Sequence, residues 1–582
     1  MMLQALIAYA EREHLGDPDF ETVGVRWLIS LGRDGQLSGD PIALAANPDE
    51  KKSKPKRLIR PKSDPDFVSH GRSYFLCDSL ERATVFVEDE AKREKRRVNQ
   101  AYFTSLIEEA AQDCQPESGA LETLAGFLRD EARLSHLHTR LTALKAKTSD
   151  NAVFSVDGRM FLESPELKAW WRRKNQKQRD DQEKSESVCL ATGVFGPVCR
   201  TAGFIKLLGE DTKLISFNKE CPAFESFGLS QAANAPVSTD AEEKFRSGLN
   251  ALIGQGLVLN NTVHLHWTRN PIEEDPFDLL ASADKNAVEA LLKSIQQGQP
   301  PVAFEANAYY ALSLSGNGAR IVVRDWLEST VPEVQRHVAE WFQDLAIVQP
   351  DGQETKRDFK FGALLYGMVR ADLEDLSPTI PTQLLHGALL GRSVPLPQAA
   401  LSAALRRQCI EPKGEDAKRN AVILARLALI KACLLRSPNS SNNNSQTKDT
   451  VMTECLNPES RDPAYLCGRL FAVFDRLQYL ALGGVNAGVV ERYYASASTM
   501  PALVMGRLFR NAQFHLAKAD GGVATNVAKD FEAIACALGD QFPASLDLES
   551  QGRFALGYYH QKADYRRRTA ERKEKETTET TK

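Results

Sequence analysis

The sequence lacks the short motifs by which several classes of enzyme are recognised. It contains no G-x-x-x-x-G-K-[ST] phosphate loop, no H-E-x-x-H zinc-binding pair and no G-x-S-x-G nucleophile turn. A His-Asp dipeptide of the kind that metal-dependent phosphohydrolases use is also missing. These absences favour a protein that is not an enzyme and that needs no cofactor.

The ten cysteines form no C-x-x-C pair, which zinc and iron–sulfur sites usually need, so we interpret them as reduced, mostly buried thiols. No stretch is as long and apolar as a membrane-spanning helix. Residues 1–16 have no basic region and no small-residue cleavage site, and they predict a short amphipathic helix rather than a secretion signal. We therefore expect a cytoplasmic protein.

Basic residues are concentrated in three runs, although the net charge is −4. Residues 51–62 hold seven basic side chains and residues 168–179 hold six, and neither run contains an acid. Residues 91–98 hold five around one glutamate. A single run is usually a solvated face, but three in the first third of an acidic chain favour a polyanionic partner. Because Trp170 and Trp171 lie within the second run and add base stacking to charge, nucleic acid is favoured over membrane.

The hydrophobic pattern predicts an α+β protein, with a mixed α/β N-terminal region and a C-terminal all-helical bundle. A chain of 582 residues is expected to form two to four folded units. Residues 99–147 have a helical period. Extended segments are predicted at 23–39 (around a turn at Arg33–Gly35), 72–87, 152–161, 213–217, 263–267 and 319–326.

Residues 214–238 follow no secondary-structure period after the first four. Thr239 and Glu242 then predict a capping box that starts a helix. The polar side chains of this long loop can either satisfy backbone groups or reach outward to a ligand. They alternate with aromatic residues, namely Phe217, Asn218, Phe224, Phe227, Gln231 and Asn234.

The pattern becomes almost purely helical from residue 376 onward. Asp462 followed by Pro463 predicts a capped helix start, and further helices are predicted near 500–518 and 522–538. The predicted organisation is a mixed region at 1–375, a helical connector at 376–436, a polar linker at 437–451, a helical bundle at 452–568 and a disordered charged tail at 569–582.

Two further features carry possible chemistry. His264 and His266 alternate in a predicted strand and would share one face, where a metal would still need further ligands. Acidic residues that could supply them are Glu273, Glu274, Asp275 and Asp278. The sequence "SLSGNGARIVVRDW" places a Gly-rich turn before a strand that carries Arg320 and Arg324. That turn is either an ordinary hairpin or an anion-binding nest.

Several segments together resemble one known family. These are "LISFN", "AFESFG", "NAPVS", "FRSGLNALI", "LSGNGARIVVRDW", "AYLCGRLFAVFDRLQ", "ERYYASASTMPALV" and "QGRFALGYYHQ". In order and spacing they are similar to the large subunit of the type I-C (Dvulg subtype) CRISPR interference complex, Cascade. The similarity extends from Met1 to about Arg568.

The resemblance implies a function that the residues alone do not give. In such complexes a guide RNA reads the target by base pairing, while the large subunit recognises a short protospacer-adjacent motif, expected to be of the 5′-TTC type, in duplex DNA and aids strand opening. It then recruits a separate helicase–nuclease, so it needs no catalytic site. The implied partners are guide RNA, double-stranded target DNA, and the backbone and guide-processing subunits.

With that function, the basic runs would neutralise phosphates, while amides and hydroxyls would read base edges. The candidate nucleic-acid contacts are Lys51, Lys52, Lys54, Lys56, Arg57, Arg60, Lys62, Arg72, Ser73, Tyr74, Arg172, Arg173, Lys174, Asn218, Gln231, Asn234, Arg320 and Arg324. The family also produces its C-terminal segment separately by internal translation, and Met452 is positioned to start it. Two alternatives remain, a metal-dependent nuclease using His264 and His266, and a standalone nucleic-acid-binding scaffold.

Overall fold

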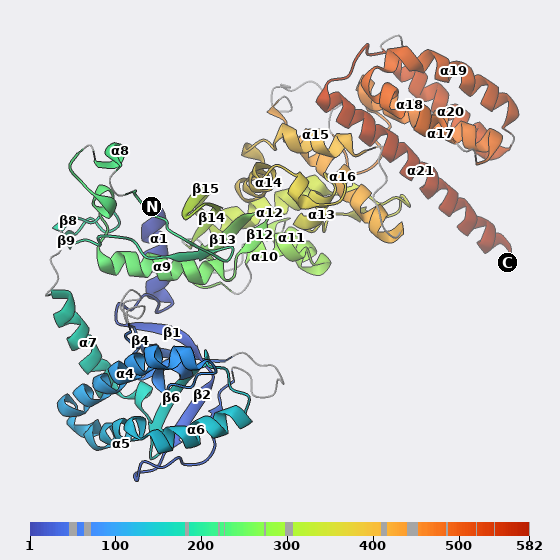
Figure 1. Cartoon of the computed structure of the whole chain (residues 1–582). Coiled ribbons are helices and arrows are strands. Elements are labelled where there is room, and N and C mark those ends of the chain that lie inside the picture. The colour runs from blue at the N-terminus through green and yellow to red at the C-terminus, as the bar shows by residue number, and fades with distance from the viewer. Residues whose placement is uncertain are drawn as a thin grey trace. The chain divides into compact units, whose positions relative to one another are not determined.

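The structure is a computed structural model with strands mainly in its N-terminal half and helices in its C-terminal part, which confirms the α+β class (Figure 1). It divides into two compact units. Unit 1 comprises residues 1–206 and 211–251, and unit 2 comprises 207–210 and 252–582. The residues described are 1–45, 55–62, 71–180, 186–218, 221–225, 227–272, 275–296, 307–408, 416–438, 452–484, 487–519, 521–539 and 542–580.

Unit 1 is built around a mixed sheet with strand order β3-β2-β6-β5, and β7 pairs with β6. β2 and β6 are parallel, with Trp27 opposite Ala152 and Leu31 opposite Val156. Nearly every residue of β6 is buried, as expected for a central strand covered on both faces. The main strands of unit 1 are β1 (Phe20–Val25), β2 (Trp27–Leu31), β3 (Ile42–Ala43), β4 (Lys56–Pro61), β5 (Cys77–Ser79), β6 (Asn151–Val156) and β7 (Arg159–Met160), and β1 and β4 pair in a separate two-stranded sheet.

Helices α4 and α5 pack on each other, and α5 also contacts β6, so the core lies between these helices and the sheet. Asp130 caps α6 by accepting hydrogen bonds from the N–H groups of Ala132 (3.0 Å) and Arg133 (3.1 Å). The helices of this unit are α1 (Met2–Arg12), α3 (Leu80–Ala83), α4 (Arg93–Asp113), α5 (Ser118–Arg129), α6 (Glu131–Ala143), α7 (Pro165–Asp180), α8 (Pro222–Glu225) and α9 (Thr239–Ile253).

Unit 2 begins with an antiparallel sheet of order β12-β13-β14-β15. Its strands are β12 (Leu257–Leu259), β13 (Thr262–Thr268), β14 (Ala308–Asn317) and β15 (Arg320–Thr330). One hydrophobic cluster joins this sheet to the helices that follow, from Leu259 to Leu434. The helices are α10 (Pro276–Ser282), α11 (Lys285–Gln296), α12 (Val331–Leu345), α13 (Phe361–Tyr366), α14 (Thr379–Leu390), α15 (Gln398–Arg406) and α16 (Asp416–Leu435).

The expected boundary at 375/376 falls inside this cluster, which also includes Met452, Tyr465 and Leu556. The 376–436 segment is therefore part of one core with the sheet that precedes it. The polar linker at 437–451 lies mostly outside the described residues.

The C-terminal helices form a bundle around a second cluster, and α17 packs along α21 (Figure 1). Asp462 caps α17 through the N–H of Tyr465 at 2.8 Å, with Pro463 in the first turn, as predicted. The helices are α17 (Pro463–Leu482), α18 (Val489–Thr499), α19 (Pro501–Lys518), α20 (Gly522–Leu538) and α21 (Leu548–Thr580). Among the described residues, no helix combines the length and the apolar character needed to cross a membrane.

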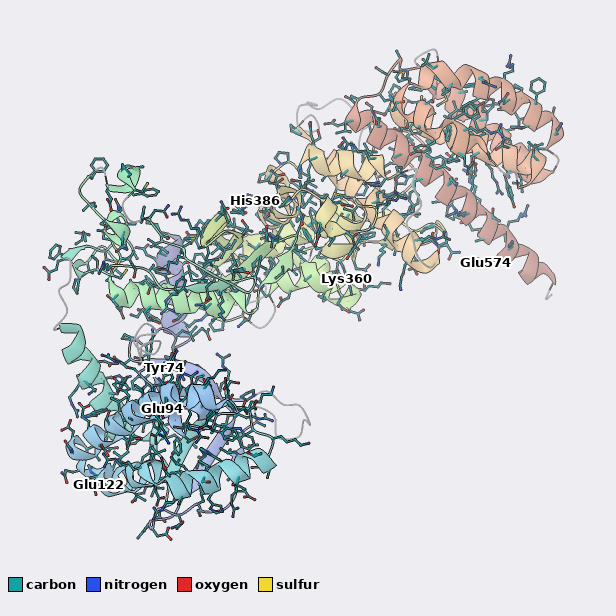
Figure 2. The ribbon with its side chains drawn as sticks, in the orientation of Figure 1. Tyr74, Glu94, Glu122, Lys360, His386 and Glu574 are labelled. Carbon is teal, nitrogen blue, oxygen red and sulfur yellow. The ribbon has the colours of Figure 1, made fainter. Side chains whose placement is uncertain are left out.

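Several predicted elements are wrong. Residues 213–217 form no strand, and in 72–87 only β5 is extended before α3 begins. The segment after the Arg33–Gly35 turn forms only a single bridge, between Leu37 and Leu31. Helix α18 was not predicted, and α21 continues past Arg568 through Glu574 to Thr580, where a disordered tail was expected (Figure 2).

The start of α9 also differs from the prediction. Ser238, not Thr239, precedes the helix and accepts a hydrogen bond from the N–H of Ala241 at 3.3 Å. The Glu242 carboxylate instead accepts the N–H of Gly203 at 2.8 Å. Burial raises the pKa of Glu242. Its role is to hold a neighbouring loop of unit 1, not to close a capping box.

Candidate nucleic-acid interface

The first basic run keeps only part of its charge available to a ligand. Lys51, Lys52 and Lys54 lie outside the described residues. Lys56 and Arg57 are exposed on β4, which pairs only with β1 among the described strands. Among the described cations of this run, Lys56 and Arg57 are the exposed ones.

The second half of the same run is built into unit 1. The Arg60 guanidinium pairs with Glu21 at 2.7 Å and lies 3.4 Å from the centroid of the Tyr74 ring. Arg60 is only 8% exposed. Lys62 forms an ion pair with Glu243. Both were expected to contact phosphates, and the structure gives them protein partners instead.

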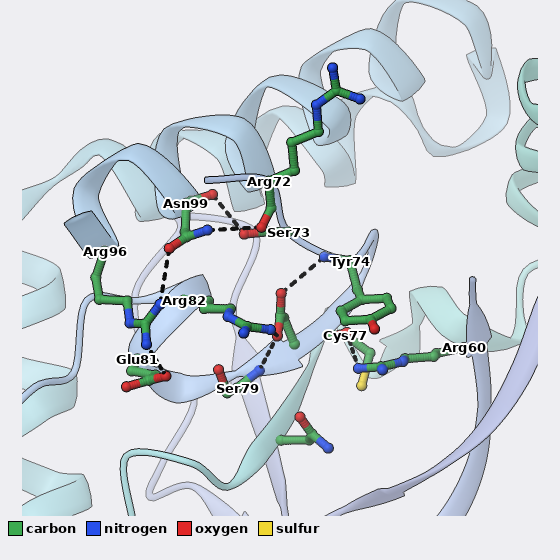
Figure 3. Close-up of polar contacts among 12 residues, drawn as sticks. Arg60, Arg72, Ser73, Tyr74, Cys77, Ser79, Glu81, Arg82, Arg96 and Asn99 are labelled. Carbon is green, nitrogen blue, oxygen red and sulfur yellow. Dashed lines mark hydrogen bonds and ion pairs between the residues drawn. The ribbon is translucent and has the colours of Figure 1, made fainter. Parts of the chain in front are cut away.

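The segment that begins at Arg72 is fixed by hydrogen bonds to α4 and to a buried carboxylate (Figure 3). The Ser73 hydroxyl donates to the carbonyl of Asn99 at 2.8 Å, and the Asn99 amide donates to the carbonyl of Arg72 at 2.8 Å. Asp78 accepts the N–H of Tyr74 at 2.9 Å, and burial raises the pKa of this carboxyl. Ser73 is fully buried, so its hydroxyl is engaged within unit 1, and its expected role in reading bases stays a prediction. The Arg72 side chain points away from this network (Figure 3).

The tryptophans of the second basic run are not stacking platforms. Trp170 and Trp171 are each 4% exposed and pack against Phe75, with ring centroids 5.1 and 5.2 Å apart. They belong to the hydrophobic core of unit 1. The expectation that these rings stack on nucleic-acid bases is therefore wrong.

The basic side chains beside them are mostly paired. Arg172 forms an ion pair with Asp17 at 2.8 Å, and Lys174 forms one with Glu109. Arg173 is exposed, and within the described part of the chain no ion pair involves it. Of Arg172, Arg173 and Lys174, Arg173 is therefore the candidate phosphate contact that is not paired with an acid among the described residues.

The run at 91–98 is likewise balanced by acids. Its ion pairs are Arg93–Glu90 (2.7 Å), Arg96–Glu81 (2.6 Å), Arg97–Glu94 (3.2 Å) and Arg97–Glu131 (3.3 Å). Such pairs lower the net charge that this run offers to a polyanion.

The amides of the long loop are largely engaged within unit 1. Gln231 accepts a hydrogen bond from Arg200 at 3.1 Å, and Asn234 donates to the Gln231 carbonyl at 3.1 Å. Asn218 is exposed. Phe227 is 89% exposed, so an apolar side chain of this loop faces solvent.

Other apolar side chains are exposed in the neighbouring hairpin of β8 (Glu186–Val188) and β9 (Phe195–Pro197). Val188 and Phe195 are directly opposite each other and are 52% and 65% exposed. The N–H of Leu190 donates to the carbonyl of Pro236, which ties this hairpin to the end of the loop. Leu190 and Val194 of the hairpin are exposed as well, and so is Leu229 of the long loop. We call the exposed apolar residues of 188–195 the hairpin patch.

The Gly-rich turn of unit 2 is an ordinary hairpin. Asn317 pairs with Arg320 across it, and Gly318 has a φ of 59°, which glycine adopts at little cost. Arg324 is exposed and donates to the Ser315 hydroxyl at 2.7 Å. Arg320 and Arg324 thus flank a hairpin.

The two histidines of β13 have separate protein partners. His264 is 1% exposed and its Nδ1 lies 2.8 Å from the Ser313 hydroxyl, while burial lowers its pKa to about 4. His266 Nδ1 lies 2.9 Å from Asp275. Each ring is therefore oriented by a neighbour of its own.

The acids expected to complete a metal site do not bring the two rings together. Asp275 and Asp278 lie 2.9 and 3.9 Å from His266, while Glu273 and Glu274 lie outside the described residues. Within the described ranges, no three His, Cys, Asp or Glu side chains are grouped closely enough to hold a metal ion.

A basic surface that was not predicted from the sequence lies where α17 and α21 pack together. A Cβ on Gly468 would meet the Phe554 carbonyl oxygen at 2.0 Å, and one on Gly557 would meet the Tyr465 carbonyl oxygen at 2.2 Å. Two glycines thus allow the helix backbones to approach closely. The longer side chains beyond this contact border a hollow of about 580 Å³.

Positive charge dominates that hollow, which we call the α17–α21 groove. Its cations are Arg476, Lys562, Arg566 and Lys573, and its one acid, Asp475, pairs with Lys562 at 3.1 Å. A smaller hollow of about 230 Å³ shares Arg476 with it and adds further basic residues of α21, including Arg572 and Lys575. Cations in excess of acids along a groove are suited to phosphate contacts.

The groove also has an aromatic side chain at its surface. Tyr479 is 59% exposed, and the Arg476 guanidinium lies 5.6 Å from its ring. An exposed ring beside cations is suited to stacking with an unpaired base.

The sequence contained a pattern that indicates this basic surface. Lys562, Arg566 and Lys573 have spacings of four and seven residues, which place them on one helical face.

Comparison with known proteins gives one result. A search of curated proteins found no match to this chain. The sequence model of the family described as CRISPR-associated protein (Cas_Csd1) matches residues 6–566, which is nearly the whole chain. This match is consistent with the resemblance to a type I-C large subunit. The chain therefore belongs to the CRISPR-associated Cas_Csd1 family.

Proposed function

We propose that this protein is the non-catalytic large subunit of an RNA-guided type I-C surveillance complex. In that role it recognises the protospacer-adjacent motif in double-stranded DNA, aids strand opening and recruits a separate helicase–nuclease. The observation that carries the proposal is the family match over residues 6–566, since it spans both units and not a single shared domain.

The α17–α21 groove supports a role for unit 2 in holding a separated strand. A duplex that has been opened exposes both phosphates and unpaired bases. The groove offers cations for the phosphates and Tyr479 for stacking on a base. Its chemistry fits single-stranded nucleic acid better than a closed duplex, whose bases are already stacked.

In unit 1 the candidate phosphate contacts that are exposed and have no acid partner among the described residues are Lys56, Arg57 and Arg173. Lys51, Lys52 and Lys54 are further candidates. These groups position a nucleic acid and do not by themselves read its sequence. Reading of the adjacent motif therefore rests on other side chains, and exposed Asn218 remains chemically suited to it.

The hairpin patch favours protein docking over nucleic-acid contact for the long loop. Its exposed groups are Val188, Phe195 and other apolar side chains, and in the loop itself Phe227 is exposed while the amides of Gln231 and Asn234 are engaged. Exposed apolar groups of this kind mark protein interaction sites. The partner in this proposal is a backbone subunit of the complex.

A C-terminal product starting at Met452 is a further part of the proposal. It would contain all of α17–α21, the helices that build the second core. In the full-length chain Met452 is 8% exposed, and the carbonyl of Glu454 accepts the N–H of Val348. Mass spectrometry of protein expressed from the native gene tests this, and detection of full-length chain alone would count against it.

The proposal is tested with the complex assembled by co-expression and a duplex library with a randomised adjacent motif. Enrichment of one short motif is expected. A variant in which Lys51, Lys52, Lys54, Lys56 and Arg57 are changed to Ala should bind more weakly with the same preference, because phosphate contacts carry no sequence information. An altered preference would place the reading residues in that run, and an absence of enrichment would favour the standalone scaffold.

A further inference from the structure

A second cavity in unit 2, of about 870 Å³, shares no lining residue with the α17–α21 groove. Its walls come from α11, α12, α16 and the segment that starts at Met452. The charged residues that line it are Glu289, Lys293, Asp344, Arg357, Arg392, Lys431 and Glu454. Its volume lies in the range of small-molecule binding sites.

One carboxylate at this cavity is shared by two guanidinium groups. Asp344 is completely buried and pairs with Arg436 at 2.6 Å and with Arg392 at 2.6 Å. The Arg436 side chain is also completely buried, and its Nη1 donates to the carbonyl of Gly387 at 2.6 Å. Two cations around one acid leave one positive charge in excess.

Lys431 adds a second positive charge without a close acid. It is 2% exposed, and within the described residues no acid lies within ion-pair distance of its ammonium group. Burial lowers the pKa of Lys431 to about 8, while Asp344 and Glu454 act in the opposite direction. The side chain is therefore still mainly protonated at neutral pH. An uncompensated buried charge destabilises a protein, and an anionic ligand would remove that cost.

The mouth of the cavity holds arginines that can take a second partner. Arg357 pairs with Glu454 at 3.1 Å, and both side chains remain about 40% exposed. Arg392 is 53% exposed although it contacts Asp344. A guanidinium has five N–H donors, so one carboxylate does not saturate it.

We propose that this cavity binds a phosphate monoester or inorganic phosphate, with Lys431 at its floor and Arg392 and Arg357 at its mouth. With the buried Arg436 behind Asp344 counted, the five cations at this cavity exceed its three acids by two, which matches a phosphate dianion better than a single carboxylate or a phosphodiester. The ligand is free phosphate, a nucleotide or the phosphorylated end of a strand. The inference does not depend on the function proposed above.

The test uses the full-length chain and measures thermal unfolding and calorimetric binding in sodium phosphate against sodium chloride at equal ionic strength. Wild-type protein should bind phosphate and unfold at a higher temperature in it. Lys431→Met should bind phosphate at least tenfold more weakly, yet unfold without phosphate at the same or a higher temperature, since it removes a buried charge. A merely structural lysine would instead lower the unfolding temperature.

Lys360→Met is the matched control, because Lys360 is an exposed lysine of unit 2 at the start of α13 (Figure 2). It should behave as wild type. If Lys431→Met fails to fold, Arg357→Gln at the solvent-exposed mouth provides the second variant and should weaken phosphate binding several-fold. Tighter binding of a nucleoside 5′-monophosphate than of phosphate would identify a nucleotide site. Tighter binding of a 5′-phosphorylated oligonucleotide than of its 5′-hydroxyl form would identify a strand end.

The proposal would be overturned if phosphate did not raise the unfolding temperature of the wild-type protein, or if it raised that of Lys431→Met by the same amount. In the second case, loss of the increase when Arg476 and Lys573 are changed to Gln would assign phosphate binding to the α17–α21 groove.

Discussion

The α17–α21 groove should carry a measurable share of the affinity for single-stranded DNA. The perturbation is the combined change of Arg476, Arg566 and Lys573 to Gln, which removes three of the four cations that border the groove. Lys562 is left in place because it pairs with Asp475 and stabilises the contact between the two helices. Arg476 contacts the Tyr479 ring and Arg566 donates to the Pro350 carbonyl at 3.2 Å, and the loss of each of these contacts should cost about 1 kcal/mol of stability.

The expected magnitude follows from counterion release. Each phosphate that is neutralised on a single strand contributes about 0.7 to the slope of log K against log salt, so three lost contacts lower the slope by about 2. The same relation gives roughly 50-fold weaker binding at about 0.15 M salt. Fluorescence anisotropy of a labelled single strand, repeated over a salt series, measures both quantities.

The matched control changes three exposed lysines elsewhere, Lys206, Lys285 and Lys360, to Gln. This variant has the same change in net charge, so any effect of overall charge appears in it too. A groove variant whose salt slope equals that of the control would refute the assignment of strand binding to this surface. A large fall in its unfolding temperature would instead indicate that the groove cations stabilise the bundle.

Gly468→Ala should destabilise the bundle by about 2 kcal/mol or more, because a Cβ there would meet the Phe554 carbonyl oxygen at 2.0 Å; an unchanged urea midpoint would contradict this packing. Burial lowers the pKa of His264 to about 4, so its contribution to stability is complete above pH 6.5 and is lost as the pH falls, by roughly 2 kcal/mol at about pH 5. Urea unfolding at both pH values should show that His264→Gln loses this part of the pH dependence, and an identical pH dependence in the two proteins would disprove the burial effect. Phe195→Ser should abolish co-purification of the backbone subunits while leaving the unfolding temperature unchanged, and retained co-purification would exclude the hairpin patch as the docking surface.

The parts of the fold that the sequence predicted well are those determined by neighbouring residues. The start of α17 follows from Asp462 and Pro463, and α19 begins at Pro501 as expected. Caps and proline act within one helical turn, so they can be read without knowing the tertiary structure. Helix α18 was missed, and its sequence "VVERYYASAST" is rich in residues of middling helix propensity.

The candidate site was predicted less well, because ion pairing depends on residues distant in sequence. Arg60 pairs with Glu21, and Lys62 pairs with Glu243 from a helix near the end of unit 1. Nothing in the run at 51–62 indicates which of its cations meets an acid. Composition therefore identified a basic segment without separating its structural cations from its exposed ones.

The aromatic residues show the same limit. Trp170 beside basic residues was interpreted as a stacking platform, yet α7 turns it into the core of unit 1. Tyr479, which is exposed, has no basic run in its own segment and was not considered. Its cationic neighbours Lys562 and Arg566 come from α21, about 80 to 90 residues later, and meet it only in the folded bundle.

In the proposed complex, this chain supplies the recognition of the adjacent motif. The decisive experiment compares guide-loaded complexes assembled with and without it, using duplexes that match the guide and differ only in that motif. Motif-dependent binding is expected only when this chain is present. Motif-dependent binding by the complex that lacks it, or equal binding of all motifs by the complex that contains it, would contradict this role.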